Sequence, residues 1–140
     1  MLIVERVAVL RNAEMFRGVR DYVLADVAQI VREIDVIPEE RFIEEGTADE
    51  SWMFVLATGK ARIHRNAVTL REVGPGSALG EFAVLDPAPR SASVTAVEPG
   101  LLFRIDRAPF HEVMLGQPDL MSNIITMLVR LARRNSDSMT

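Results

Sequence analysis

The segment GEFAVLDPAPRSA, residues 80–92, places one carboxylate and one guanidinium on either side of a small apolar stretch. Glu81 follows Gly80 directly, and Arg90 follows a proline. A forked guanidinium can bind an anion such as a phosphate through two parallel hydrogen bonds. A carboxylate can only accept hydrogen bonds, for example from a sugar hydroxyl. The pair therefore predicts a ligand that carries a negative group and a hydroxyl close together.

The backbone of the same segment can support such a site. Gly80 lets the main chain come close to a ligand, because it has no side chain. Residues 81–85 can form one helical turn, and its first N–H groups, at Phe82 and Ala83, would face the anion. Ser91 adds a hydroxyl beside the arginine. These residues alone leave a second interpretation open, in which Glu81 and Arg90 form a structural ion pair or a solvated surface.

The remaining sequence predicts short strands between two helical ends. From about residue 33, β-prone runs alternate with turn sequences such as ATGK, GPG and EPG, which is typical of a β sandwich or jelly roll. Asp106 is a candidate cap for a short helix, and Pro118 opens a longer helix with a wide apolar stripe. We expect a single domain over residues 1–140, with N-terminal helices over 1–32, a β roll over 33–105 and C-terminal helices over 106–140.

Composition and charge exclude several classes of function. The chain has 140 residues, a formal net charge of −4 and no cysteine, so disulfides, zinc–thiolate sites and iron–sulfur clusters are absent. A chain with this net negative charge is not expected to have the broad basic surface that binding to a nucleic-acid backbone requires, so we expect no direct nucleic-acid binding. No apolar run approaches membrane-spanning length and no secretory signal is visible, so a cytoplasmic location is the default expectation.

Neither histidine favours a metal site or catalysis. His64 follows Lys60 and Arg62 on the polar side of an expected strand, which predicts a surface residue. His111 follows Phe110 in a short helix, as a solvent-facing or packing residue. A jelly-roll metal enzyme needs several inward-facing imidazoles with a carboxylate, and the serines of the segment have no neighbouring base to activate them. We therefore expect no metal, no cofactor and no enzymatic activity.

The segment resembles the phosphate-binding cassette of the cyclic nucleotide-binding domain family. That family's pattern is Gly-Glu, small or apolar residues, then Pro-Arg, a small residue and alanine. It stands here as Gly80-Glu81-Phe82-Ala83 and Pro89-Arg90-Ser91-Ala92, with the family's spacing. The resemblance extends through RFIEEGTADESWMFVLATGKARIHR, LREVGPGSALGE and LLFRIDRAPFHEVM, so it covers nearly the whole chain. Leu79 departs from the pattern, because the family often has phenylalanine there.

The resemblance implies a role for each residue of the cassette. Glu81 would bind the ribose 2′-hydroxyl of a cyclic nucleotide. Arg90 would bind the cyclic phosphate, aided by Ser91 or Ala92 and by the backbone of residues 82–83, next to Gly80.

The resemblance also implies how the rest of the ligand is enclosed. The fold would be mainly β with flanking helices, a β roll whose C-terminal lid helix, or that of a partner copy, covers the base. Leu70, Leu79 and Val94 are implied as the apolar wall around sugar and base. Asn135 and Ser136 fall where polar base contacts are made in bacterial relatives.

The implied function is a regulatory sensor that couples nucleotide binding to movement of its C-terminal helix. We expect cyclic AMP as the ligand, with cyclic GMP as the alternative, because a serine after the arginine suits both. The expected partners are the nucleotide, an effector outside this chain, and a second copy in a homodimer through the C-terminal helix. The alternative function is a docking or dimerisation module of the same fold that has lost nucleotide binding.

Overall fold

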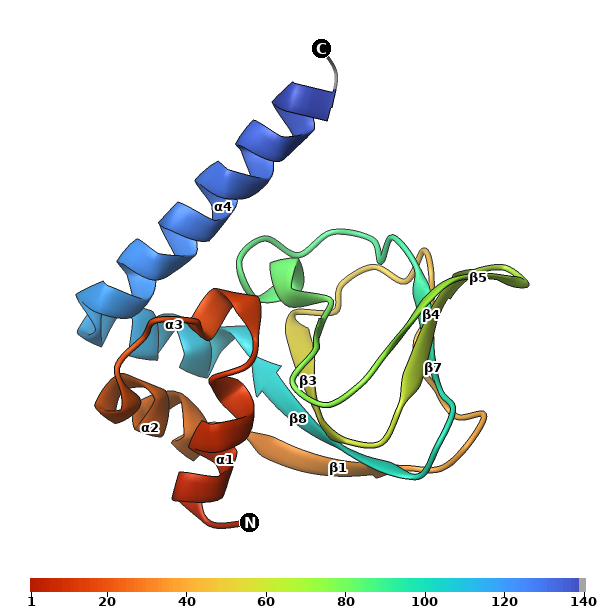
Figure 1. Ribbon diagram of the computed structural model, residues 1–140, viewed down its shortest axis with the longest axis horizontal. Coiled ribbons are helices and arrows are strands. Elements are labelled where there is room, and N and C mark those ends of the chain that lie inside the picture. Colours follow the sequence, from red (N-terminus) through yellow and green to blue (C-terminus); the bar gives the residue numbers. More distant parts are fainter. Residues whose placement is uncertain (139–140) are drawn as a thin grey trace.

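The computed structural model describes residues 1–138 and arranges them as a β roll with helices at both ends (Figure 1). The helices are α1 (Ile3–Leu10), the short 3-10 helix η1 (Glu14–Phe16), α2 (Asp21–Gln29), the 3-10 turn η2 (Glu81–Val84), α3 (Arg107–Gly116) and α4 (Pro118–Ser138). The strands are β1 (Arg32–Val36), β2 (Arg41–Ile43), β3 (Trp52–Thr58), β4 (Ala61–Arg65), β5 (Val68–Val73), β6 (Ala78–Leu79), β7 (Ser93–Ala96) and β8 (Gly100–Asp106). The predicted fold class, a β roll with helices before and after it, is confirmed. The first strand begins at Arg32, and residues 139 and 140 of the expected C-terminal segment lie outside the described residues.

The strands form two antiparallel sheets. The helix-side sheet has the order β1-β8-β3-β6, and the outer sheet has the order β2-β7-β4-β5. The central strand β3 is buried on both faces: Met53 and Val55 belong to the core under the helices, whereas Phe54 and Leu56 belong to the core between the sheets. This double burial explains why the run WMFVLA shows no alternation of polar and apolar residues.

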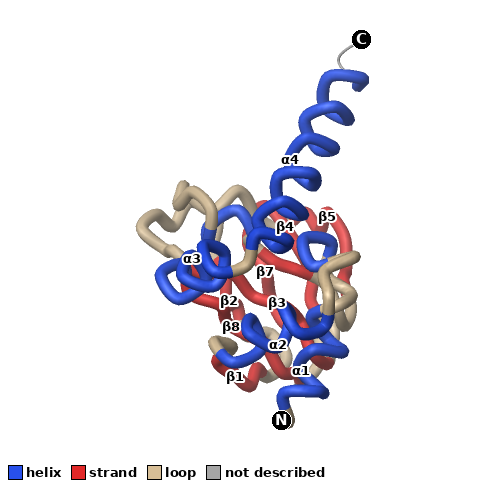
Figure 2. The backbone as a smooth tube through the Cα atoms, turned by 90° about the vertical axis from the view of Figure 1, so that its left-hand side faces the viewer, coloured by secondary structure: helices blue, strands red, loops and turns tan. Residues whose placement is uncertain are grey.

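The terminal helices pack together on the helix-side sheet. Phe16 of η1 and Phe110 of α3 meet edge to face, with ring centroids 6.2 Å apart, and both are fully buried. The first turns of α4 join this core through Leu120 and Ile124. The second half of α4 extends away from the rest of the molecule (Figures 1 and 2). Within the described residues, no helix has the length and apolar character needed to cross a bilayer.

Two local expectations are wrong. His64, expected at the surface, is 1% exposed: its Nδ1 donates to the Asn66 carbonyl at 2.9 Å, and its Nε2 lies 2.8 Å from the Thr95 hydroxyl. The cause is the neighbouring strand β7, which pairs with β4 and supplies a polar partner for the ring. Asp106 does precede α3, but its carboxylate binds Arg104 at 2.8 Å and makes no hydrogen bond to the helix N-terminus.

Candidate functional site

The cassette begins at a sharp turn after strand β6. Gly80 has a φ of +65°, a left-handed conformation that glycine adopts without strain, and η2 follows directly. The N–H of Ala83 donates to the Gly80 carbonyl at 3.1 Å. One of the two N–H groups expected to face an anion, at Phe82 and Ala83, is therefore already satisfied inside the turn.

Arg90 is held from two other segments of the chain. Its side chain is 4% exposed, and its Nε donates to the Glu50 carboxylate at 2.9 Å. Its Nη2 donates to the Trp52 carbonyl at 2.7 Å and its Nη1 to the Gly80 carbonyl at 3.3 Å. The ion pair of Arg90 is thus with Glu50 and not with Glu81, and the sequence did not point to Glu50.

The backbone of Arg90 is fixed by the loop between β2 and β3. The Arg90 N–H donates to the Thr47 carbonyl at 3.0 Å, and the Gly46 N–H donates to the Arg90 carbonyl at 2.8 Å. This loop therefore positions both the main chain and, through Glu50, the side chain of the arginine.

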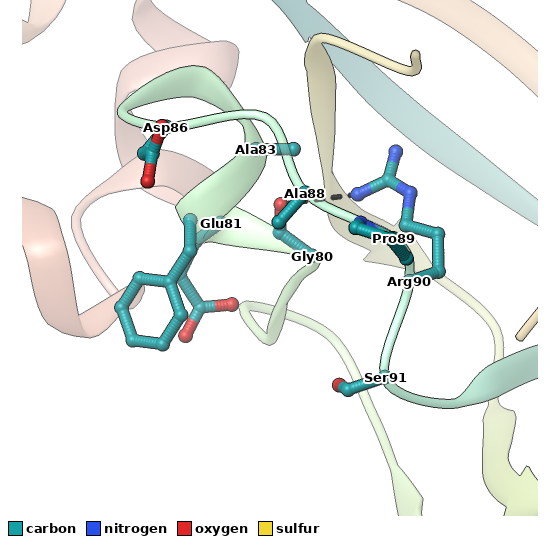
Figure 3. A pocket seen from close by; sticks show the side chains of 9 residues that line it. Gly80, Glu81, Ala83, Asp86, Ala88, Pro89, Arg90 and Ser91 are labelled. Atoms are coloured by element: carbon teal, nitrogen blue, oxygen red, sulfur yellow. Dashed lines mark hydrogen bonds between the residues drawn. The ribbon is translucent and has the colours of Figure 1, made fainter. Parts of the chain in front are cut away.

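The guanidinium keeps capacity for a ligand. An arginine has five N–H donors, and each of the three side-chain hydrogen bonds uses one. One N–H on each Nη atom is therefore left to donate to an anion. Figure 3 shows the guanidinium of Arg90 turned toward the Gly80 carbonyl and away from Ser91, whose hydroxyl points to the side on which the Glu81 carboxylate lies.

The environment of Glu81 disfavours its charged form. Burial raises the pKa of the Glu81 carboxyl above its ordinary value, and the nearby Glu14 carboxylate acts in the same direction. The backbone N–H of Glu81 and the cation of Arg71 lower that pKa, but less than burial raises it. A half-buried carboxyl without a cationic partner at bonding distance suits a neutral hydrogen-bonding ligand such as a hydroxyl.

The raised pKa of Glu81 predicts a pH-dependent stability. Because the folded protein holds this proton to higher pH than the unfolded chain does, the stabilising effect is present below the ordinary pKa and is lost as pH rises through the raised one. The Glu81→Gln variant should therefore lose less unfolding free energy than the natural protein as the pH rises above the ordinary pKa of a glutamate, about 4.3. Urea unfolding at several pH values measures this difference, and parallel stability curves would contradict it.

Two adjoining cavities share the same four residues. A cavity of about 330 Å³ lies inside the cassette and a second, of about 180 Å³, lies against the outer sheet. Gly80, Glu81, Arg90 and Ser91 line both of them. Glu81, Arg90 and Ser91, the polar residues predicted for the site, therefore line the same two cavities, while the guanidinium itself is turned toward Glu50, Trp52 and Gly80.

The wall of the second cavity is one row of side chains across the outer sheet. Strand pairing places Ile43 opposite Val94, Val94 opposite Ile63, and Ile63 opposite Arg71, and all four line the cavity. Leu79 and Ala92 also line it, so two of the three expected wall residues, Leu79 and Val94, lie there. Ile43, Ile63 and Arg71 were not anticipated from the sequence.

Leu70 does not join this wall. The register of β4 and β5 shifts between Ile63 and His64, so that Arg71 pairs with Ile63, Thr69 pairs with His64, and Leu70 has no partner. Leu70 is 49% exposed and lines neither cavity. The bulge turns the adjacent arginine, rather than the leucine, toward the ligand site.

Asn135 and Ser136, the expected base contacts, lie in the last turns of α4. Both are exposed and neither lines either cavity of the cassette. Within residues 1–138, no three histidine, aspartate or glutamate side chains are grouped so that they could hold a metal ion. His111 donates from Nε2 to the Val84 carbonyl at 3.0 Å and so supports the cassette from α3.

Comparison with known proteins places these features in a family. The cyclic nucleotide-binding domain model matches residues 34–117, which is more than half of the chain. A CRP-like cAMP-activated global transcriptional regulator of Mycobacterium tuberculosis is 24% identical over 94% of this chain and 60% of its own length. A cAMP-dependent protein kinase regulatory subunit of Yarrowia lipolytica is 28% identical over 72% of this chain and 27% of its own length.

Solved structures agree with the fold. The N-terminal domain of a transcriptional regulator from Streptomyces coelicolor superposes with a TM-score of 0.86 at 24% identity, covering 94% of this chain and 95% of that domain. The regulatory domain of Toxoplasma gondii PKA, a co-crystal structure with cAMP, superposes with a TM-score of 0.72 at 26% identity, covering 79% of this chain and 44% of that one. The chain spans 60% or less of the two curated relatives described above. With its cassette and β roll, the chain belongs to the cyclic nucleotide-binding domain family.

Proposed function

We propose that this chain is a regulatory domain that binds cyclic AMP in the opening between Glu81, Arg90 and Ser91. The observation that carries the proposal is the convergence of these three side chains on two adjoining cavities, with two guanidinium N–H groups left for an anion. The phosphate would lie against Arg90, and the ribose would lie between Glu81 and the apolar row that contains Val94.

The names of the relatives support cyclic AMP over cyclic GMP as the ligand. Relatives named as cAMP-activated or cAMP-dependent are found alongside a cGMP-dependent protein kinase of Toxoplasma gondii, which is 29% identical over 78% of this chain. Calorimetric titration with both nucleotides in parallel tests the choice. Saturable binding that is tighter for cyclic AMP supports the proposal, and an absence of binding to either nucleotide would refute it.

The ribose assignment gives a second test within the same titration. The Glu81→Ala variant should bind cyclic AMP about tenfold more weakly, because the 2′-hydroxyl loses its hydrogen-bond acceptor. The same variant should bind 2′-deoxy cyclic AMP with little change, since that ligand never made the hydrogen bond. Equal losses for the two ligands would remove Glu81 from this role.

The output of the domain would be a change in the position of α4. Its N-terminal end is tied to the N-terminal helices: Gln117, which precedes α4, donates to Asp26 at 2.7 Å, and Asn123 in α4 donates to the Met15 carbonyl at 2.7 Å. Its last turns are exposed. A ligand that contacts the last turns would favour one arrangement of the helix over others, and that difference in affinity is the signal.

We further propose that α4 pairs with a second copy of the chain. Its exposed apolar side chains include Ile125 (56% exposed), Leu128 (39%) and Val129 (43%). Met121, Ile125, Leu128, Ala132 and Asn135 follow the spacing of four and three residues that is typical of a coiled-coil seam. In such a dimer, Asn135 and Ser136 of one copy would be brought near the seam, where a base could be covered.

A single charge in the seam should separate the copies. We expect the natural chain to sediment as a dimer and the Leu128→Asp variant as a monomer, because a carboxylate would be buried against a partner helix. Thr126→Asp is the matched control, since Thr126 is exposed on a different side of the same helix. Analytical ultracentrifugation over a range of concentrations measures the masses; a natural chain that stays monomeric would contradict the pairing.

If the domain is instead a docking module that has lost nucleotide binding, titration with a cyclic nucleotide should show no binding. The docking-module alternative requires a concentration-dependent mass with no heat and no thermal shift on addition of either nucleotide. The seam on α4 supports this alternative as well as the sensor, so the titration is the experiment that separates them.

A further inference from the structure

Most arginines of this fold are neutralised by an acidic neighbour. Nine arginines of the described chain form ion pairs with acidic side chains, and Arg90 is one of them, with its Nε 2.9 Å from the Glu50 carboxylate. Arg90 can still donate hydrogen bonds to an anion in contact with it. At longer distance, however, a paired guanidinium and carboxylate largely cancel each other's field. The residue proposed to hold the phosphate therefore attracts an approaching anion only weakly.

The surroundings of Arg90 contain further acidic side chains. Glu81 and Asp86 line the cassette cavity together with Arg90, and the loop between β2 and β3 adds the exposed Glu45. The whole chain has a formal net charge of −4. An anionic nucleotide would therefore be repelled during its approach unless cations close to the opening compensate for these charges.

Three arginines without an ion pair surround this opening. Arg71 lines the cavity against the outer sheet. Arg65, at the end of β4, donates from Nε to the Ser91 carbonyl at 3.0 Å. Arg17 and Arg71 line a third cavity, of about 540 Å³, which also reaches Glu81. All three arginines are exposed, and within residues 1–138 none of them pairs with an acidic side chain.

The three cations come from both sides of the cassette. Arg17 directly follows η1, whereas Arg65 and Arg71 belong to the hairpin of β4 and β5. In Figure 1 the cassette lies between η1, drawn in red, and this hairpin. The charge of Arg71 also acts inside the site: burial raises the pKa of the Glu81 carboxyl, and Arg71 lowers it in part. An anion that approaches from either side therefore meets an unpaired cation before it reaches Arg90.

We propose that Arg17, Arg65 and Arg71 form a cationic rim that steers the anionic nucleotide into the cassette and so sets its association rate. This inference rests on the proposed binding of a cyclic nucleotide at Arg90. Charges at the exposed rim of a binding site chiefly change the association rate and its dependence on salt, whereas buried charge pairs change the dissociation rate. The rim thus captures the ligand, and Arg90 retains it.

Stopped-flow kinetics over a range of salt concentrations test this role. The ligand is cyclic AMP with an uncharged fluorophore on its base, and calorimetry with unlabelled cyclic AMP gives the equilibrium affinity. The rim-neutral variant combines Arg17→Gln, Arg65→Gln and Arg71→Gln. The rim-lysine variant replaces the same three residues by lysine, which keeps the charges and removes the guanidinium groups.

A third variant controls for net charge. It combines Arg11→Gln, Arg20→Gln and Arg32→Gln, which change the net charge by the same amount as the rim-neutral variant. These three arginines lie at the ends of α1 and α2 and on β1, pair with acidic side chains, and line neither cavity of the cassette. Thermal unfolding of every variant verifies that each is folded at the temperature of the kinetic measurement.

At an ionic strength of about 10 mM, where the Debye length is about 30 Å, the rim-neutral variant should associate about tenfold more slowly than the natural chain. Its dissociation rate should stay within about twofold of the natural value. The difference in association rate should disappear near 1 M salt, where the Debye length is about 3 Å. The rim-lysine variant and the net-charge control should associate within about twofold of the natural rate.

Four results would overturn the proposal: an unchanged association rate in the rim-neutral variant, an equal loss in the net-charge control, an equal loss in the rim-lysine variant, or a loss of affinity that comes from faster dissociation. The last two would assign the arginines to direct contacts with the ligand instead of steering. Failure of the proposed function is distinct, since the natural chain would then show no saturable binding of any cyclic nucleotide in calorimetry.

Discussion

Replacement of Arg90 by alanine is expected to weaken cyclic nucleotide binding by about 2–5 kcal/mol, the usual cost of removing one member of a buried charge pair. The phosphate would lose the two N–H groups that the side chain still has available after its bonds to Glu50, Trp52 and Gly80. Calorimetric titration of the natural chain and the variant measures the difference. A change of less than threefold in affinity would show that the phosphate lies elsewhere.

The same substitution should also lower the free energy of unfolding. It leaves the Glu50 carboxylate and the Trp52 carbonyl without their donor inside the fold. Arg104→Ala separates the two effects: Arg104 binds Asp106 at 2.8 Å and lies 3.9 Å from the Trp52 ring centroid, but lines neither cavity of the cassette. This control should lose stability and keep its affinity, so a loss of affinity in both variants would point to a general folding defect.

The second large effect is expected for Gly80→Ala. The φ of +65° at this residue is strained for alanine, and the added Cβ would collide with Arg90 Nη1. We expect a loss of about 1–3 kcal/mol of unfolding free energy and at least about tenfold weaker nucleotide binding, because the guanidinium must leave its position. Urea unfolding and calorimetry on the same preparation measure both quantities.

Gly18→Ala is the matched control for Gly80→Ala. Gly18 has a φ of +79°, yet a Cβ there would meet no atom within 4 Å, so this variant suffers backbone strain without a collision. It should lose some stability and bind the nucleotide as the natural chain does. If the two variants behave alike, strain alone explains Gly80 and the contact with Arg90 has no importance for binding.

The residues of the cassette could be identified from the sequence because they lie close together along the chain. Gly80, Glu81, Arg90 and Ser91 lie within twelve positions, and their types indicate a ligand with an anionic group and a hydroxyl, with a structural ion pair as the second interpretation. The β-roll fold was likewise predictable, since turn sequences separate the short strands. Residues that are neighbours in the chain are, in both cases, also neighbours in the fold.

Glu50 and Glu14 could not be singled out in the same way. The chain has 20 acidic residues, and these two come 40 and 76 positions before Arg90. Their neighbours are set by the loop between β2 and β3 and by the packing of η1. Nothing local distinguishes a carboxylate that meets a guanidinium in the fold from one that is solvated.

Strand alternation was misleading at two positions. The bulge at Leu70 moves Arg71 to the cavity, and the partner strand buries His64 against Thr95. Both outcomes depend on a neighbouring strand, and a register shift reverses the face of a residue without any change in its type.

The three hydrogen bonds of Arg90 inside the fold have a consequence for how this domain can evolve. A descendant that no longer binds a nucleotide still needs the arginine to satisfy Glu50 and the Trp52 carbonyl, so selection for folding alone retains it. Glu81 has no such ion pair: its burial disfavours the charged form, and the hydrogen bond that affects its pKa comes from its own backbone N–H. If Glu81 binds the ribose as proposed, its loss among descendants of this chain would indicate a domain that no longer binds a nucleotide, whereas retention of the arginine alone would not indicate binding.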